Sequence, residues 1–239
     1  VPSGRTTLAN IIAAPANPAH VAPDQPLLIV GAHYDSVSRS PGADDNGSGV
    51  AGLLELARLL AVDAPPGLRL VAFCPEEPPA YRTKAMGSYL YAQGLKTAKT
   101  RVTGMICLEM IGFFSDAPGS QSYPLPFMNI FYPDRGNFIA MVGSLRSIPW
   151  ARQVSKAFAK ATDLPVSTLN GPALIVGIDF SDHWSFNKFG YPALMVTDTA
   201  FYRNPHYHLP SDIPNTLDYT RAAKVVTGLA AAIRMIASR

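Results

Sequence analysis

The chain has 239 residues, of which 20 are Lys or Arg and 17 are Asp or Glu, so its formal net charge is +3. Hydrophobic residues make up 48% of the sequence, which excludes a disordered chain, and no Lys/Arg block is present to bind nucleic acid. The longest apolar runs are far shorter than the ~20 residues that a membrane span needs. The length suits one large domain or two small ones, and because the sequence shows no linker we expect a single domain over residues 1–239.

The predicted elements alternate along the chain between short apolar strands and amphipathic helices. Strands are predicted at residues 8–14, 27–33, 68–74, 102–109, 138–142 and 193–197. Helices are predicted at residues 50–60, 149–161 and 222–236, where apolar side chains recur three or four residues apart. This alternation predicts an α/β fold, a three-layer αβα sandwich with a central mixed, mostly parallel β-sheet.

Three further features of the sequence are a long loop, the first residue of the chain and the two cysteines. Residues 115–134 are rich in Pro and aromatic side chains and are too long for a simple connection, so we interpret them as a functional loop or a short insertion. The chain begins at Val1 rather than Met, which favours a trimmed N-terminus and a secreted or periplasmic protein over a cytoplasmic one. Cys74 and Cys107 lie in apolar runs and are expected to be buried free thiols.

Acidic and His residues follow the predicted strands. Only four of the 17 acidic residues are Glu, and three of these stand at strand ends: Glu76, Glu77 and Glu109. The strand at 27–33 ends in His33, and the loop after the last strand contains His206 and His208. Ligands of open α/β sheets bind outside the carboxyl ends of the strands. Imidazole and carboxylate groups at this edge indicate a metal site.

Each of these pieces also has a purely structural interpretation. His33 and Asp35 could be a core histidine with its carboxylate partner, and Glu76-Glu77 could be a solvated turn. The segment Asp44-Asp45-Asn46 could cap the following helix. Taken together, however, the residues match the needs of a two-metal hydrolase, which uses a bridging carboxylate, further ligands for each ion and a general base.

Six motifs, in order, resemble those of the M28 family of zinc aminopeptidases, which have a phosphorylase/hydrolase-like α/β fold. They are His33-x-Asp35, the segment from Pro41 to Gly49, Glu76-Glu77, the segment from Leu108 to Gly112, Ser181-Asp182-His183, and Tyr207-His208-x-x-x-Asp212. The resemblance covers residues 27–220 and implies that the chain is a single M28-type catalytic domain.

The resemblance also implies roles for individual residues. Those implied for the metal ligands are His33, Asp44, Glu77, Glu109 and His208, with Asp44 as the carboxylate that bridges two Zn²⁺ ions. The resemblance further implies that Glu76 is the general base, that Asp35 orients His33, and that Asp182 and Asp212 give support. It implies a cis peptide bond after the bridging Asp, which would be the Asp44–Asp45 bond. His208 is preferred over His206 because its spacing to Asp212 fits the motif.

The implied activity is hydrolysis of the N-terminal peptide bond by a metal-bridged water, with Glu76 as general base. Substrates would be peptides or small aminoacyl compounds with a free N-terminus, with no nucleic acid partner. A single-zinc glutaminyl-peptide cyclotransferase and a non-catalytic peptidase-like binding domain are the alternatives. A serine hydrolase is disfavoured because the sequence has no G-x-S-x-G motif.

Overall fold

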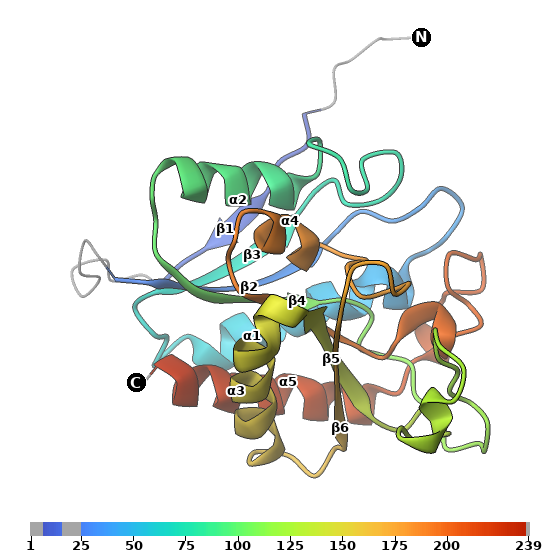
Figure 1. Ribbon diagram of the computed structural model, residues 1–239. Coiled ribbons are helices and arrows are strands. Elements are labelled where there is room, and N and C mark those ends of the chain that lie inside the picture. Colours follow the sequence, from blue (N-terminus) through green and yellow to red (C-terminus); the bar gives the residue numbers. More distant parts are fainter. Residues whose placement is uncertain (1–6, 16–24, 238–239) are drawn as a thin grey trace, which may run out of the picture.

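The central feature is one seven-stranded mixed β-sheet, seen in a computed structural model that describes residues 7–15 and 25–237 (Figure 1). The strand order is β1-β3-β2-β4-β7-β5-β6. β1 pairs antiparallel with β3, and β5 pairs antiparallel with β7, whereas the other four pairings are parallel. The strands are β1 (Ile11–Ala13), β2 (Leu27–His33), β3 (Leu68–Phe73), β4 (Val102–Leu108), β5 (Ile139–Ser144), β6 (Val166–Gly171) and β7 (Ala193–Thr197).

Helices cover both faces of the sheet. α1 (Gly49–Leu60), α3 (Ile148–Ala159) and α5 (Tyr219–Ala237) lie on one face, and α2 (Gly87–Thr97) and α4 (His183–Lys188) lie on the other (Figure 1). α5 packs against both α1 and α3. The predicted three-layer fold with a mixed, mostly parallel sheet is therefore confirmed.

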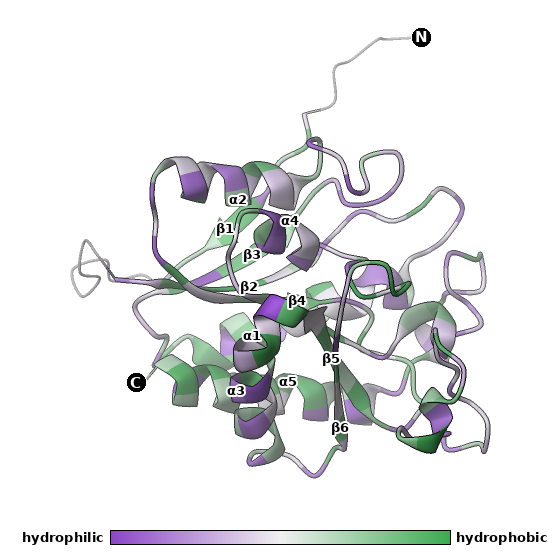
Figure 2. Ribbon diagram, viewed as in Figure 1, coloured by the Kyte–Doolittle hydropathy of each residue, from purple (hydrophilic) through white to green (hydrophobic). Residues whose placement is uncertain are grey.

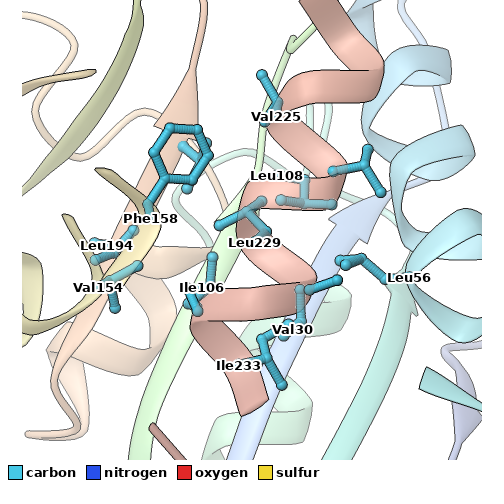
Figure 3. Packing of buried hydrophobic residues seen from close by; sticks show 14 of the residues in the cluster. Val30, Leu56, Ile106, Leu108, Val154, Phe158, Leu194, Val225, Leu229 and Ile233 are labelled. Carbon is cyan, nitrogen blue, oxygen red and sulfur yellow. The ribbon is translucent and has the colours of Figure 1, made fainter. Parts of the chain in front are cut away.

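The hydrophobic core is divided by the sheet into two clusters. The larger one joins alternate residues of β2 and β4 to the inner faces of α1, α3 and α5, as Figure 3 shows for Val30, Ile106, Leu56, Phe158 and Leu229. Along α3 and α5 hydrophobic and hydrophilic residues alternate, as expected for helices that are half covered (Figure 2). Each fully buried Leu or Phe contributes about 1.5–3 kcal/mol relative to exposure. The smaller cluster lies under α2 and α4.

The predicted elements agree with the structure at most positions. The strands at 27–33 and 193–197 have the predicted bounds, and the three predicted helices are α1, α3 and α5. The sequence analysis missed β6, α2 and α4. Cys74 and Cys107 are buried and free, as predicted. In the part of the chain that is described, no helix is both long and apolar enough to cross a membrane.

The sheet topology places the polar residues on one edge. β3, β2, β4 and β7 are neighbours that run in the same direction. Their carboxyl ends therefore meet at one edge, where His33 is the last residue of β2 and Glu109 directly follows β4. Glu76 and Glu77 follow β3 after two further residues.

Candidate metal centre

Six side chains meet at the carboxyl edge of the sheet, and we call them the ligand cluster: His33, Asp45, Glu76, Glu77, Glu109 and His208. His33 Nε2 lies 3.3 Å from a carboxylate oxygen of Glu109 and 3.3 Å from Oδ1 of Asp45. The His33 side chain is only 1% exposed. The ends of β2 and β4 and the segment before α1 thus converge on one imidazole nitrogen.

Asp45 lies between the two histidines. Its Oδ1 faces His33, and its Oδ2 is 3.0 Å from Nε2 of His208. The same His208 nitrogen is 3.5 Å from Oε2 of Glu77. Ligand atoms of His33, Asp45 and Glu77 all lie within 4.8 Å of one another, which is close enough for a shared cation. Asp45 is therefore the carboxylate with one oxygen directed at each histidine.

The structure corrects the expected place of Asp44. Its Oδ1 accepts a hydrogen bond from the backbone N–H of Gly112 at 3.0 Å, and its Oδ2 accepts one from Nδ2 of Asn204 at 2.7 Å. Both oxygens thus face away from the two histidines, and Asp45 has the position expected for Asp44. The non-proline cis peptide bond likewise lies one residue later than expected, between Asp45 and Asn46.

Local backbone geometry explains this one-residue difference. Gly42 has a φ of 67°, and Asp45 and Asn46 have non-helical angles inside an otherwise helical turn. The neighbouring side chains of Asp44 and Asp45 therefore point in opposite directions. The two backbone N–H groups of Asp44 and Asp45 donate to the carboxylate of Asp212 at 2.9 and 3.1 Å, so Asp212 holds the turn in place.

Asn46 ties this turn to the sheet. Its Nδ2 donates to the carbonyl of Leu108, the last residue of β4, at 2.8 Å. Its Oδ1 accepts from the N–H of Met110 at 3.1 Å. These two bonds fix the turn above the end of β4, next to Glu109. The position of Asp45 is therefore set by the residues on either side of it.

Asp35 connects the His and Glu halves of the cluster. Its carboxylate accepts hydrogen bonds from the backbone N–H groups of Glu76, at 3.0 Å, and Glu77, at 3.1 Å. Its Oδ1 is also 3.6 Å from Nδ1 of His33, and its carbonyl oxygen is 3.1 Å from the same nitrogen. The structure thus brings Asp35 next to His33, as the sequence analysis expected.

Carboxylates outnumber imidazoles in the cluster, and this shifts the ionisation of its members. Burial raises the pKa of Glu76 well above its ordinary value, and the charges of Glu109, Asp182 and Glu77 add to the increase. Burial also raises the pKa of Glu109, although the neighbouring His33 opposes the change.

The two histidines and Asp45 instead favour their charged forms, because the pKa of each histidine is raised and that of Asp45 is lowered. Burial lowers the pKa of His208, but the hydrogen bonds to Asp45 and Glu77 outweigh it and bring the pKa to about 10. Burial raises the pKa of Asp45, yet its bonds to His208 and His33 bring it to about 2. The site therefore favours positive charge between its carboxylates.

The donor set fits zinc or a similar divalent cation. Oxygen and imidazole nitrogen are the donors such ions take, and two ions require a carboxylate that reaches both. Oε1 of Glu77 is buried without a hydrogen-bond partner among the described residues, so it is available as a further donor. A pair of cations would supply the positive charge that the carboxylates lack.

The other candidate residues lie outside the cluster. Nδ1 of His206 is 3.0 Å from Oγ of Ser211, and its ring contacts Phe113, so the geometry favours His208 over His206. His183 is buried and its Nε2 contacts the carbonyl of Ile178. Asp182 is buried near the cluster, and burial raises its pKa to about 7.

Sequence reasoning also missed residues that support the cluster. Ser181 Oγ donates to Oε2 of Glu109 at 2.6 Å and so orients this carboxylate. The sequence could not distinguish Asp45 from Asp44 as the residue between the two histidines, because the two are adjacent and of the same type. Spacing to the motifs gave the segment but not the residue.

An apolar pocket of about 80 Å³ opens beside Glu109. Its walls come from residues 121–132, from β5 and β6, and from the loops that precede α4 and follow β7. The predicted functional loop at 115–134 therefore contributes part of the wall. Apolar and aromatic lining residues include Tyr123, Met128, Val142, Ile178, Phe180, Met195 and Phe201. Glu109 is the pocket's only acidic lining residue within the part of the chain that is described.

The fold is α/β, its cluster of imidazole and carboxylate groups could hold a metal ion, and the comparisons identify the family. Residues 10–233 match peptidase family M28, and the chain belongs to this family. It is 52% identical over 215 residues to the uncharacterized protein YfbL of Escherichia coli (strain K12), covering 86% of this chain and 66% of that protein. It is 25% identical over 235 residues to a probable leucine aminopeptidase of Arthroderma otae, covering 91% of this chain and 56% of that protein.

Solved structures share the fold. BSAP, a zinc aminopeptidase from Bacillus subtilis, is 26% identical with a TM-score of 0.67, and the match covers 95% of this chain and 49% of that one. A glutaminyl cyclase of Fimbriiglobus ruber is 22% identical with a TM-score of 0.62, covering 95% of this chain and 74% of that one. The chain therefore spans only part of the length of these relatives.

Proposed function

We propose that the protein is a two-zinc aminopeptidase that removes apolar N-terminal residues from peptides. The observation that carries this proposal is the position of Asp45, with one carboxylate oxygen directed at each of two histidines from opposite ends of the chain. The relatives named leucine aminopeptidases support the same activity. The apolar pocket beside Glu109 fits a side chain such as that of leucine.

The cluster divides into two sets of donors that share Asp45. His33 and Glu109 would hold one zinc ion with Asp45, and Glu77 and His208 would hold the other. When bound, the two ions polarise the scissile carbonyl and make a water acidic enough to attack at neutral pH. Compared with the ligands expected from the sequence, this set has Asp45 in place of Asp44 and keeps the other four residues.

The protein's own residues would perform the proton transfer. Glu76 would accept a proton from the attacking water and pass it to the leaving amine. Asp35 would hold the backbone of Glu76 and Glu77 and the ring of His33 in register. Carboxylates of the cluster would attract the free amino group of the substrate, which limits cleavage to the first peptide bond.

Metal analysis and a substrate panel test this proposal. We expect two zinc ions per chain and hydrolysis of leucyl anilide that is lost in EDTA and restored by zinc. Cyclisation of glutaminyl peptides by a protein with one zinc would instead indicate the cyclotransferase activity. Absence of both metal and activity would leave a non-catalytic binding domain.

A matched pair of Glu variants tests the general base. Glu76→Gln should retain its metal and lose about 10²–10⁴-fold in kcat, because the amide cannot accept the proton. Glu55→Gln is the control, since Glu55 lies on the exposed surface of α1, where it pairs with Arg58. Full activity of the Glu76 variant would refute the role of Glu76.

A further inference from the structure

One wall of the apolar pocket is a loop without a core of its own. Residues 122–135, which we call the wall loop, include the lining residues Tyr123 and Met128, and none of them is buried. Phe127 and Phe131 are 74% and 83% exposed. A segment with few buried apolar contacts opens easily by itself. The position of this wall therefore depends on the residues at the two ends of the loop.

Both ends of the wall loop contact the side chain of Arg203. Gln121 precedes the loop, and its Oε1 accepts a hydrogen bond from Nε of Arg203 at 2.9 Å. Gly136 follows the loop and lies against the same side chain, since a Cβ at Gly136 would come within 2.6 Å of Cδ of Arg203. Gln121 and Gly136 are both buried. One side chain thus touches the two points where the wall loop joins the rest of the protein.

Arg203 also connects the wall loop to other walls of the pocket. Residues 199–202 directly precede it and line the pocket from the loop after β7. Its Nη1 donates to the carbonyl of Phe138 at 2.9 Å, and its guanidinium lies 4.6 Å from the centroid of the Phe138 ring, which lines the pocket as well. Arg203 lies behind these residues, so it acts on the pocket through their positions.

A buried charge at this place contributes little to the stability of the fold. Arg203 is 7% exposed, and its Nη2 is buried without a hydrogen-bond partner among the described residues. Burial lowers the pKa of Arg203 to about 10, although the charge of Asp198 opposes the change. A buried cation with an unpaired donor costs free energy, and apolar side chains in such places are often at least as stable. The contacts that Arg203 makes to the wall loop explain its presence better than stability does.

We propose that Arg203 is a positioning residue, which sets the side-chain preference of the pocket by fixing both ends of the wall loop. This inference rests on the proposed aminopeptidase function. With both ends held, the wall loop closes the pocket around a branched side chain such as that of leucine. With the ends released, the wall moves outward and loses its apolar contacts to that side chain. A substrate that begins with alanine makes few such contacts and is affected less.

The Arg203→Lys variant tests this role and retains the charge. An ammonium group lacks the planar geometry of a guanidinium, so it cannot hold Gln121 and the carbonyl of Phe138 together. We expect the ratio of kcat/KM for leucyl over alanyl anilide to fall about tenfold, at the lower end of the roughly 10–200-fold that one methylene contributes in an apolar pocket. The change should appear in KM for the leucyl substrate, with kcat and zinc content nearly unchanged.

A second variant tests whether the contact with Gln121 carries the effect. Gln121→Leu removes the acceptor for Nε of Arg203 and should lower the same ratio by a similar factor. The double variant should be no worse than Arg203→Lys alone, since the two residues act through one contact. Should Arg203→Lys fail to fold, the ratio measured for Gln121→Leu decides by itself.

Arg221→Lys is the matched control. The Arg221 guanidinium also lies over an aromatic ring, that of Phe114 at 5.8 Å, and pairs with Asp116 and Asp218. None of these residues lines the pocket. This variant should keep the leucyl-to-alanyl ratio of the wild type and melt at most about 4 °C lower, because exposed ion pairs contribute little.

Two further measurements do not depend on turnover. Affinity for isoamylamine, which has the side chain and amine of leucine, should fall about tenfold in Arg203→Lys, as the ratio of kcat/KM does. Affinity for ethylamine, which has the side chain and amine of alanine, should not change. Chymotrypsin should cut the folded variant after Phe127 or Phe131 faster than it cuts the wild type, because the wall loop opens without global unfolding.

The possible outcomes separate this inference from the proposed function. An unchanged leucyl-to-alanyl ratio in a folded, zinc-bound Arg203→Lys variant refutes the inference and leaves the proposed function intact. Equal losses for both substrates with a lower melting temperature would assign Arg203 to the stability of the fold and overturn the inference as well. Losses that multiply in the double variant would refute action through the Gln121 contact. A wild-type protein without metal-dependent activity refutes the proposed function and this inference together.

Discussion

Two adjacent aspartates at the site, Asp44 and Asp45, should respond very differently to the same change. Asp45→Asn retains the shape of the side chain but removes the charge that lies 3.3 Å from His33 and 3.0 Å from His208. We expect this variant to lose at least one of the two proposed zinc ions and about 10²-fold or more in kcat/KM, since both proposed donor sets share this carboxylate.

Asp44→Asn should instead affect stability. Both oxygens of Asp44 accept N–H groups, from Gly112 at 3.0 Å and from Asn204 at 2.7 Å. The side-chain amide of the variant has only one acceptor oxygen, so either the N–H of Gly112 or that of Asn204 would face the N–H group of this amide. Asn204 cannot reverse its own amide freely, because its Oδ1 accepts the N–H of His206 at 2.9 Å.

The expected cost of Asp44→Asn follows from these contacts. Losing one hydrogen bond to a charged group and burying an unpaired donor costs about 2–4 kcal/mol. In a chain of this size that corresponds to a decrease of roughly 4–16 °C in melting temperature. The measurements are zinc content after gel filtration and thermal unfolding in EDTA. If Asp44→Asn loses zinc and Asp45→Asn retains it, the assignment of Asp45 is wrong.

Three further predictions concern the pH dependence, the core and the support of Glu109. Burial lowers the pKa of His183 to about 4, so its contribution to stability is complete above about pH 6.5 and is lost as the pH falls towards 4. Between pH 7 and pH 4 the wild type should lose about 3 kcal/mol more than His183→Gln in chemical denaturation, and equal pH profiles would contradict this. Gly104→Ala should destabilise the protein by about 1–3 kcal/mol, because the new methyl group would overlap the ring of Trp150. Gly94→Ala, in an exposed turn of α2 with open space around it, should stabilise the protein by about 0.5–1 kcal/mol in the same assay, and two changes of the same sign would refute the packing argument. Ser181→Ala should weaken zinc affinity about 10–100-fold in a chelator competition, since Glu109 loses the hydroxyl 2.6 Å from its Oε2, and unchanged affinity would contradict this role.

The elements that the sequence predicted well are those with a strong apolar pattern. Strand β2 and helix α5 have continuous or periodic apolar residues and lie in the centre of the fold. β6 was missed because its residues are polar and only partly buried at the edge of the sheet. α4 has six residues, and α2 contains Gly94 and two Tyr residues, so neither has a clear helical signal.

The site was predicted to the level of a segment. His33, Glu77 and Glu109 lie close together because each stands at or shortly after the end of a strand, whereas His208 reaches them from the long loop after β7. The choice between Asp44 and Asp45 depends on the φ and ψ angles of a turn that is neither strand nor helix.

The spacing of the strands in the sheet determines how close together the backbones of the site residues lie. Glu77, His33 and Glu109 follow three adjacent strands, β3, β2 and β4. Adjacent strands are about 4.8 Å apart, so side chains from neighbouring strand ends can reach one small site. The regular spacing of the strands thus brings the backbones that carry these side chains close together before any ion binds. Exchange of one divalent ion for another of different radius should therefore be accommodated by side-chain rotation, with the strands unmoved.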